Sequence, residues 1–206
     1  MKKKKNKESK KNVIIAIAII ALIALLAGGT FSWWTWRSAN NTAVSVTVKG
    51  MTMTLDGGGN ISTKNLVPTT CSNTTYAIQR TITYKVSNST NIAATATIQL
   101  DPTTFPSALK NANLKWKLTT SANCGGTEEA SGTFSSTTQG TKMNLKSYTV
   151  AANTAATATG NTKTLYLSIW LDTGYTYQNI GDSVGDPMQD KSMTLKLAGT
   201  IAQNQS

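Results

Sequence analysis

Histidine is absent from this 206-residue chain. Without an imidazole the chain cannot form a Ser-His-Asp or Cys-His catalytic site or an HExxH-type zinc site, and it lacks the usual general base near neutral pH. Cysteine occurs only twice, too rarely for a zinc site made of thiolates alone. These absences argue against a hydrolase, so we expect a protein that is not an enzyme and that carries no cofactor.

Sustained helical spacing is also missing after residue 36, and charged residues make up only 14% of the chain. Thr, Ser, Asn and Gly dominate instead, and Thr suits the pleated, half-buried surface of a β-sheet. Several segments alternate apolar and polar residues, which is the spacing of strands with one buried face. The sequence therefore predicts an all-β fold, a two-layer antiparallel sandwich of the jelly-roll type, preceded by an N-terminal hydrophobic signal or anchor helix.

One long hydrophobic run is present, at residues 13–27, and it follows seven lysines in the first 12 positions. A basic start, a short apolar stretch and a small-residue exit are typical of an export signal. The small-x-small site Thr30-Phe31-Ser32 places cleavage between Ser32 and Trp33. A spanning helix needs about 20 apolar residues, and counting on through Trp36 reaches that length. The alternative to cleavage is therefore a single N-terminal membrane anchor.

Most of the net charge of +11 belongs to this N-terminal segment. Removing residues 1–32 leaves 174 residues with 13 basic and eight acidic side chains, a balance of +5 that is spread singly along the chain. No cluster of Lys or Arg is interleaved with aromatic residues, so we expect no nucleic-acid partner. The expected organisation is a signal or anchor at residues 1–32, a spacer at residues 33–42 and one β-sandwich domain at residues 43–206.

The alternating segments also suggest which strands are partners. Residues 44–48 and 51–55 form one predicted pair, and residues 76–86 and 92–100 form a predicted antiparallel hairpin that ends at Asp101-Pro102. Residues 165–171 are apolar on both faces and are expected to pair with residues 193–201, where Gly199 marks a bulge or a close approach. The other expected strands are residues 114–118, 132–137 and 142–150.

The two cysteines, Cys71 and Cys124, both lie in loop-like sequence. In a chain that leaves the reducing cytosol, an even number of cysteines favours a disulfide, which here would join two loops. Closing a loop of this size would stabilise the fold by about 4 kcal/mol in the chain-entropy model. The alternative is two unrelated buried thiols.

Two acidic motifs are candidates for chemistry. Asp172-Thr173-Gly174 follows an apolar strand, as in an aspartic protease, but it occurs once, whereas that mechanism needs two aspartates that share a proton. We therefore interpret it as a strand that ends in a turn. Asp182, Asp186 and Asp190 offer oxygen ligands for Ca²⁺, but they lack the spacing of a known calcium loop, which favours a solvated turn.

Three segments carry a family resemblance. The apolar run ends in a Gly-Gly-Thr-aromatic junction at residues 28–31, Asn65-Leu66-Val67-Pro68 precedes the strand at residues 76–86 and the turn after it, and a strand pair closes the chain with residues 191–195 in its second strand. Together these segments resemble the camelysin/TasA family of exported bacterial surface and biofilm-matrix proteins. The resemblance implies a jelly-roll subunit that a dedicated signal peptidase processes and that assembles into extracellular fibres.

The expected function is thus a structural subunit of a bacterial cell-surface or biofilm-matrix fibre, located outside the cell, with the membrane contacted only through the N-terminal segment. Its expected partners are copies of itself and, during export, the signal peptidase. A strand near a free chain end can complete the sheet edge of a neighbouring copy, and its alternative is to pair within its own sandwich. The expected donor strand consists of Ala43, Val44, Ser45, Val46, Thr47, Val48 and Lys49.

Two other functions are open at this level. A membrane-anchored adhesin or carbohydrate-binding β-sandwich would use exposed aromatic side chains such as Trp170 and Tyr175. A secreted protease would depend on Asp172.

Overall fold

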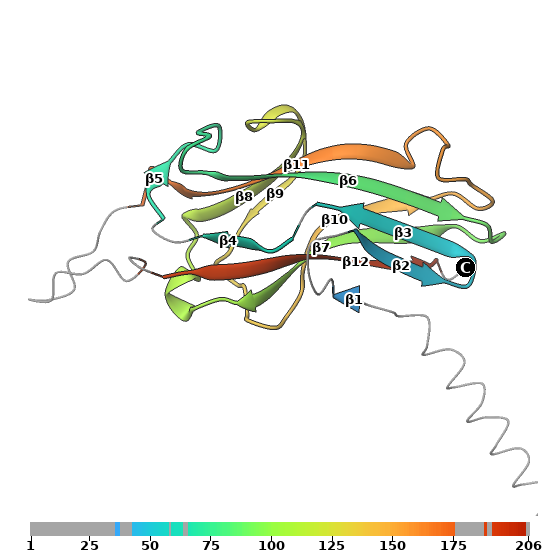
Figure 1. Ribbon diagram of the computed structural model, residues 1–206, viewed down its shortest axis with the longest axis horizontal. Coiled ribbons are helices and arrows are strands. Elements are labelled where there is room, and N and C mark those ends of the chain that lie inside the picture. The colour runs from blue at the N-terminus through green and yellow to red at the C-terminus, as the bar shows by residue number, and fades with distance from the viewer. Residues whose placement is uncertain are drawn as a thin grey trace, which may run out of the picture. The chain divides into compact units, whose positions relative to one another are not determined.

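The computed structural model describes residues 36–37, 43–57, 59–63, 66–175, 188 and 191–204 (Figure 1). The expected signal or anchor, the cleavage point between Ser32 and Trp33, and the calcium candidates Asp182, Asp186 and Asp190 lie outside these residues. The described part of the chain contains no α-helix, and its one helical segment is a short 3-10 turn at Ser107–Leu109. The predicted all-β class is therefore confirmed.

The strands form two curled sheets with a β-sandwich-like arrangement (Figure 1). The five-strand sheet has the order β1-β12-β7-β10, with β4 also paired to β12. Its strands are β1 (Trp36–Arg37), β4 (Ile61–Thr63), β7 (Ala94–Thr104), β10 (Met143–Val150) and β12 (Met193–Gln203). Every strand pair in this sheet is antiparallel.

The seven-strand sheet has the order β2-β3-β6-β11-β8-β9, with β5 also paired to β11. Its pairs are antiparallel except for the short parallel contact of β5 with β11. Its strands are β2 (Val44–Val48), β3 (Met51–Asp56), β5 (Pro68–Thr69), β6 (Ile78–Asn88), β8 (Leu114–Ser121), β9 (Gly125–Thr133) and β11 (Thr162–Asp172).

Alternate residues of the two sheets form one core. Ile98 and Leu100 of β7 are fully buried, as are Leu165 and Ile169 of β11. Burying one such side chain contributes roughly 1.5–3 kcal/mol, so the two-residue period of apolar side chains is the main source of the attraction between the layers.

The predicted hairpin at residues 76–86 and 92–100 is wrong. β6 pairs with β3 and β11, whereas β7 pairs with β12 and β10, so residues 89–93 cross from one sheet to the other. Both strands do have an apolar face, which includes Tyr84 on β6 and Ile98 on β7. Two such strands can bury these faces against each other across a sandwich as well as beside each other in one sheet, so alternation alone could not distinguish the two arrangements.

Three further expectations fail in their details. β11 and β12 are not partners, because β11 lies between β6 and β8 while β12 pairs with β7. β7 does not end at Asp101-Pro102 but continues to Thr104, and the ladder shifts register next to Pro102, which has no N–H to donate. Of the strand expected at residues 132–137, only residues 132–133 are strand, because β9 runs from Gly125 to Thr133 and a bend and turn follow it.

Candidate functional site

The expected donor strand is β2, and it lies at an edge of the seven-strand sheet. The described part of the chain pairs it with β3 in an unbroken register from Val44 opposite Leu55 to Val48 opposite Met51. Its side chains alternate strictly: the three valines are 2–7% exposed, while Ser45 and Thr47 between them are exposed. Within its own chain, β2 therefore fills a groove with three apolar side chains and presents an uncharged polar face outward.

β2 lies beside β3 in the same sheet and packs against β12 of the other sheet, and we call the space that its valines fill the β2 groove. Met51, Met53 and Leu55 of β3 point into the core and are at most 1% exposed. β12 approaches closely at Gly199, where an added Cβ would lie 3.0 Å from Leu55 Cδ1 and 3.0 Å from Met53 Cε. The predicted close approach at Gly199 is confirmed, because a side chain there would displace groove residues.

A two-residue turn, Lys49-Gly50, joins β2 to β3. Both residues have positive φ, 39° at Lys49 and 81° at Gly50, as the tight turn of a hairpin requires. The Gly50 carbonyl accepts hydrogen bonds from the Ser89 N–H at 2.9 Å and from the Ser89 hydroxyl at 2.7 Å. The turn is therefore fastened to the end of β6.

A charged cluster lies at the opposite edges, where β9 ends one sheet and β10 ends the other. The Glu129 carboxylate of β9 lies 3.7 Å from Lys146 Nζ and 3.6 Å from Lys163 Nζ, and it accepts a 3.3 Å hydrogen bond from the Tyr148 hydroxyl. Lys163 Nζ also sits 4.5 Å from the centre of the Tyr148 ring. Side chains from three strands of both sheets thus meet around one carboxylate.

Two tyrosines form the inner end of this cluster. The rings of Tyr84 and Tyr148 lie 5.1 Å apart between centroids. Burial raises the pKa of the Tyr84 hydroxyl, and burial followed by the neighbouring Glu129 carboxylate raises the pKa of the Tyr148 hydroxyl. Both hydroxyls therefore stay protonated in the folded chain well above neutral pH.

The disulfide between Cys71 and Cys124 is confirmed, with the two Cα atoms 6.0 Å apart. Gln79 of β6 links the two loops, because its amide donates to the Cys71 carbonyl at 3.4 Å and accepts from the Asn123 N–H at 3.3 Å. Gln79 is out of phase with the inward-facing Ile82, so the bridge lies over the outer face of the seven-strand sheet. A structural disulfide of this kind suggests a non-cytosolic location.

Asp172 ends β11 in a turn, as the sequence indicated. Its carboxylate accepts a 3.0 Å hydrogen bond from the Gly174 N–H and lies 3.1 Å from Lys115 Nζ. The Gly174 hydrogen bond first, and then Lys115, lower the pKa of this carboxyl, so it stays ionised. Across the residues that the structure describes, no group of three or more His, Cys, Asp or Glu side chains could hold a metal ion.

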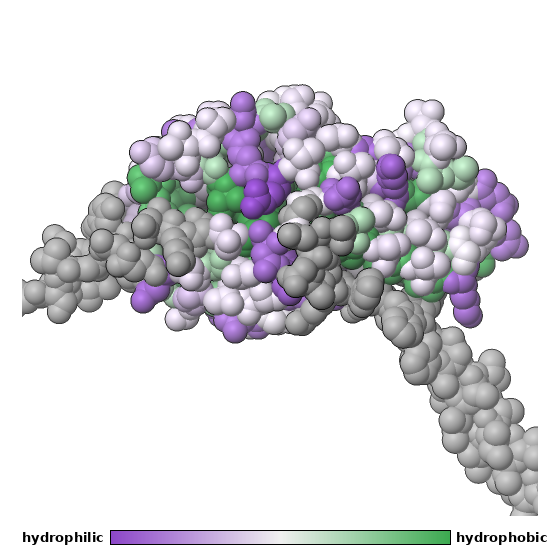
Figure 2. Space-filling view, viewed as in Figure 1, coloured by the Kyte–Doolittle hydropathy of each residue, from purple (hydrophilic) through white to green (hydrophobic). Residues whose placement is uncertain are grey.

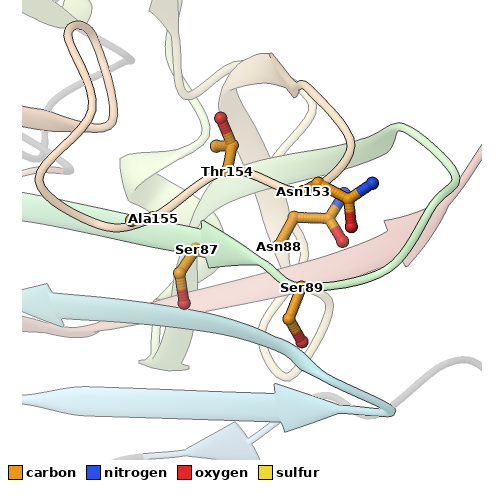
Figure 3. Close-up of a pocket in the computed structure, with 6 residues that line it drawn as sticks. All are labelled: Ser87, Asn88, Ser89, Asn153, Thr154 and Ala155. Carbon is orange, nitrogen blue, oxygen red and sulfur yellow. The ribbon is translucent and has the colours of Figure 1, made fainter.

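A shallow pocket of about 350 Å³ lies beside the end of β6 (Figure 3). Its side chains do not converge, because Ser87 and Ser89 point to one side of the strand and Thr154 points to the other. The Asn88 amide is already engaged, since Nδ2 donates to the Ile92 carbonyl at 2.8 Å and to the Ala151 carbonyl at 3.1 Å. We interpret the pocket as a junction of turns. It is lined by Ser87, Asn88, Ser89, Asn153, Thr154 and Ala155.

The aromatic side chains expected to be exposed are buried. Trp170 is 7% exposed and Tyr175 is 8% exposed, so neither offers a flat surface on which a sugar ring could stack. The face of the molecule in Figure 2 is largely hydrophilic or weakly polar, with hydrophobic residues in separate small areas. The burial of Trp170 and Tyr175 corrects the expectation that these two side chains are exposed, whereas Tyr76 is 55% exposed.

The comparisons with known proteins identify no relative. No family model and no curated protein matches the chain. A xylanase 10C variant from Cellvibrio japonicus, solved in complex with xylopentaose, matches with a TM-score of 0.29 and 11% identity, over 85% of this chain and 27% of that chain. The Stig cyclase FisC from Fischerella sp. TAU, in complex with an indole compound, matches with a TM-score of 0.19 and 11% identity, over 85% of this chain and 87% of that chain.

These two likenesses carry no argument about fold or function at such scores. The chain spans about a quarter of the length of the xylanase chain, at 27%. In the described ranges, no helix is long and apolar enough to cross a membrane.

Sequence reasoning missed two features of the site. The Glu129 cluster joins strands that are distant in sequence, and its one signal is that Glu128-Glu129 is a pair of adjacent acids in a chain with only nine acids. The Ser89 contact with Gly50 could not be found at all, because it depends on β6 lying beside β3.

Proposed function

We propose that the protein is an exported, non-enzymatic structural subunit of a bacterial cell-surface or biofilm-matrix fibre, and that copies of the chain assemble by donating the strand at residues 43–49. The observation that carries the proposal is the form of β2. It is an uncharged edge strand in regular register, and three valines attach it to the core. The resemblance of the sequence to the camelysin/TasA family of exported surface and matrix proteins supports the same function.

Strand donation follows from the groove that β2 occupies. The groove is bounded by the edge of β3 and by apolar side chains, and it recognises a strand through main-chain hydrogen bonds and alternate side chains. A second copy carries the identical strand, so its Val44, Val46 and Val48 would fill the same space. Repeating that contact from copy to copy in one direction gives an open filament.

For the fold we propose a jelly roll with an added hairpin. Two four-strand layers, β4-β12-β7-β10 and β6-β11-β8-β9, follow the chain in the alternating order of two interlocked Greek keys. The β2-β3 hairpin then extends the second layer beyond β6. On this description β2 is not one of the eight jelly-roll strands, so its exchange would leave the jelly roll itself complete.

The location that we propose is extracellular, at the cell surface or in the matrix. The disulfide supports a compartment that is oxidising. The sequence of residues 1–32 supports export, followed by cleavage between Ser32 and Trp33 or by retention as an anchor.

Mixed variants, each with one added cysteine beside the Cys71–Cys124 bridge, test the assembly mode directly. Ser45 and Thr54 are register partners on β2 and β3, and the described residues hold no free cysteine that would compete. The full chain is purified in detergent as Ser45→Cys and as Thr54→Cys, and the two are mixed and oxidised. Where β2 of one copy pairs with β3 of another, the two added cysteines lie opposite each other, so a covalent dimer should form faster than by random collision of exposed thiols. A mixture of Thr54→Cys with Ser131→Cys, an exposed position on β9, gives the background.

Deletion of residues 33–49 gives a second test. The shortened chain should form no fibres by negative-stain microscopy and should bind an added peptide of the deleted sequence. Fibres of normal appearance from the deleted chain, or cross-linking at the background level, would rule out strand donation.

A further inference from the structure

Ser89 makes the contact that holds the β2-β3 turn in place. Its N–H and its hydroxyl both donate to the Gly50 carbonyl, at 2.9 Å and 2.7 Å. Gly50 ends the turn and continues the β3-β6 register, in which Met51 lies opposite Asn88. The Ser89 hydroxyl therefore adds a side-chain hydrogen bond that fixes the Gly50 carbonyl, and with it the conformation of the turn, against β6.

A fixed network positions Ser89. The neighbouring Asn88 is fully buried, and its amide donates to the Ile92 and Ala151 carbonyls. The Asn88 side-chain oxygen accepts hydrogen bonds from the Thr90 N–H at 3.0 Å and from the Thr90 hydroxyl at 2.7 Å. Figure 3 shows Asn88 and Ser89 side by side at the end of β6. Ser89 is thus held in place by contacts that lie outside the β2-β3 hairpin.

The turn itself is strained. Lys49 adopts a φ of 39°, in the left-handed region that side chains other than glycine disfavour. At Gly50 an added Cβ would lie 2.6 Å from the Ser89 hydroxyl oxygen, so the contact leaves no room for a side chain. Short strained hinges favour the exchange of a strand between copies, because the extended hinge relieves the strain. Strain at Lys49 and the Ser89 contact therefore act in opposite directions.

We infer that Ser89 is a positioning residue that keeps β2 in its own groove and slows its exchange with a second copy of the chain. This inference rests on the proposed strand donation. The Ser89 contact would then limit how soon assembly begins. Ser89 follows β6 and lies outside the donated strand.

Ser89→Ala tests the inference, with Ser87→Ala as its matched control. Ser87 lies two positions earlier on β6 and lines the same pocket, but none of its described contacts is a side-chain hydrogen bond to the hairpin. Each substitution is placed in both chains that carry an added cysteine, and the rate of the Ser45→Cys to Thr54→Cys cross-link is measured. Losing one hydrogen bond to a carbonyl should accelerate cross-linking roughly two- to tenfold in Ser89→Ala. Ser87→Ala should match the parent.

Lys49→Gly should act in the opposite direction. Glycine adopts the positive φ of the turn without strain, so the closed hairpin becomes more stable. Cross-linking should slow by roughly two- to fivefold. Amide hydrogen exchange of β2 and β3 in the full chain, without any cysteine change, gives an independent readout of hairpin opening. Exchange should be faster in Ser89→Ala and slower in Lys49→Gly.

The two readouts separate the inference from the proposed function. Faster amide exchange in Ser89→Ala without any intermolecular cross-link in any variant would support the contact and refute strand donation. Equal cross-linking and equal amide exchange in Ser89→Ala and Ser87→Ala would overturn the role of Ser89, whether or not the chain polymerises.

Discussion

The two long sides of the sandwich are closed in different ways. On one side β2 lies beside β12, and Val44, Val46 and Val48 fill the space between the sheets. On the other side β9 and β10 meet through Glu129, which contacts Lys146, Lys163 and Tyr148. One closure is apolar and regular, and the other is charged.

This difference decides which side suits contact with another copy. An apolar closure is non-directional, so any strand with the same alternation can replace β2. The charged closure needs particular groups at particular distances, and the register of β9 and of β10 is broken by shifts. Inward-pointing charges and bulges are devices that protect sheet edges from unwanted pairing. The β9-β10 side therefore has features that protect a sheet edge, whereas the β2 side, for which we propose strand exchange, has none of them among the described residues.

The largest expected effect on stability comes from placing a charge among the valines of β2, on the apolar side of the sandwich. Val46→Asp puts an unpaired carboxylate at a position that is 3% exposed, and we expect a loss of about 4 kcal/mol or more in the free energy of unfolding. Thr47→Asp, next to it on the exposed face, should change stability by less than about 0.5 kcal/mol. Urea unfolding measures both, and equal effects would show that β2 is not attached through its valines.

The disulfide is expected to have the next largest effect, and it acts on the charged side by holding the β8-β9 turn. Cys71→Ser should lower stability by about 2–4 kcal/mol and the melting temperature by several degrees. Thermal unfolding with and without reductant checks this. Identical curves for the parent under the two conditions would show that the bridge does not stabilise the fold.

Removing the central charge of the β9-β10 side should cost less. Glu129→Gln leaves Lys146 and Lys163 without their shared carboxylate, and we expect a loss of about 1 kcal/mol because the cluster is only partly shielded from water. The more exposed Glu128, paired with Lys117 at 2.9 Å, provides the control, and Glu128→Gln should give no measurable change. A double-mutant cycle with Lys163→Met isolates the Glu129 to Lys163 coupling.

The smallest effect is a pH dependence of the tyrosine pair. The pKa of Tyr84 and of Tyr148 is raised in the folded chain, so above the ordinary tyrosine pKa of 10.0 the unfolded chain loses protons that the folded chain keeps. The stability contributed by these groups is full below pH 10 and decreases as the pH rises further. Tyr84→Phe should reduce this dependence.

At neutral pH, Tyr84→Phe should be neutral or stabilising by up to about 1 kcal/mol, because the Tyr84 hydroxyl is buried without a hydrogen-bond partner in the described structure. Unfolding curves recorded between pH 8 and pH 11, as approximate limits set by the tyrosine pKa, would show both effects. A large loss of stability at neutral pH would mean that this hydroxyl has a partner.

The local sequence pattern was sufficient to predict several individual strands and some of their contacts. The alternation at residues 44–48 and 51–55 predicts both strands and their pairing, since a two-residue link leaves no other partner within reach. The loop-like cysteines predict their own bridge, because only one pairing exists. Gly199 predicts a close approach, because glycine weakens a strand and is therefore expected where a neighbouring segment leaves no room for a side chain.

What the sequence by itself determined is therefore the class of the fold, the inward face of the strongly alternating strands such as β2, β3 and β7, and the disulfide. Only the tertiary structure decided which strands are neighbours, and β6 and β7 show why: an apolar face is satisfied equally by a partner in the same sheet or by one in the opposite sheet. The Glu129 cluster and the Ser89 contact were decided at the same level. Both join residues that are distant in sequence, and hydrogen bonds and ion pairs depend on distances that exist only once the sheets have packed.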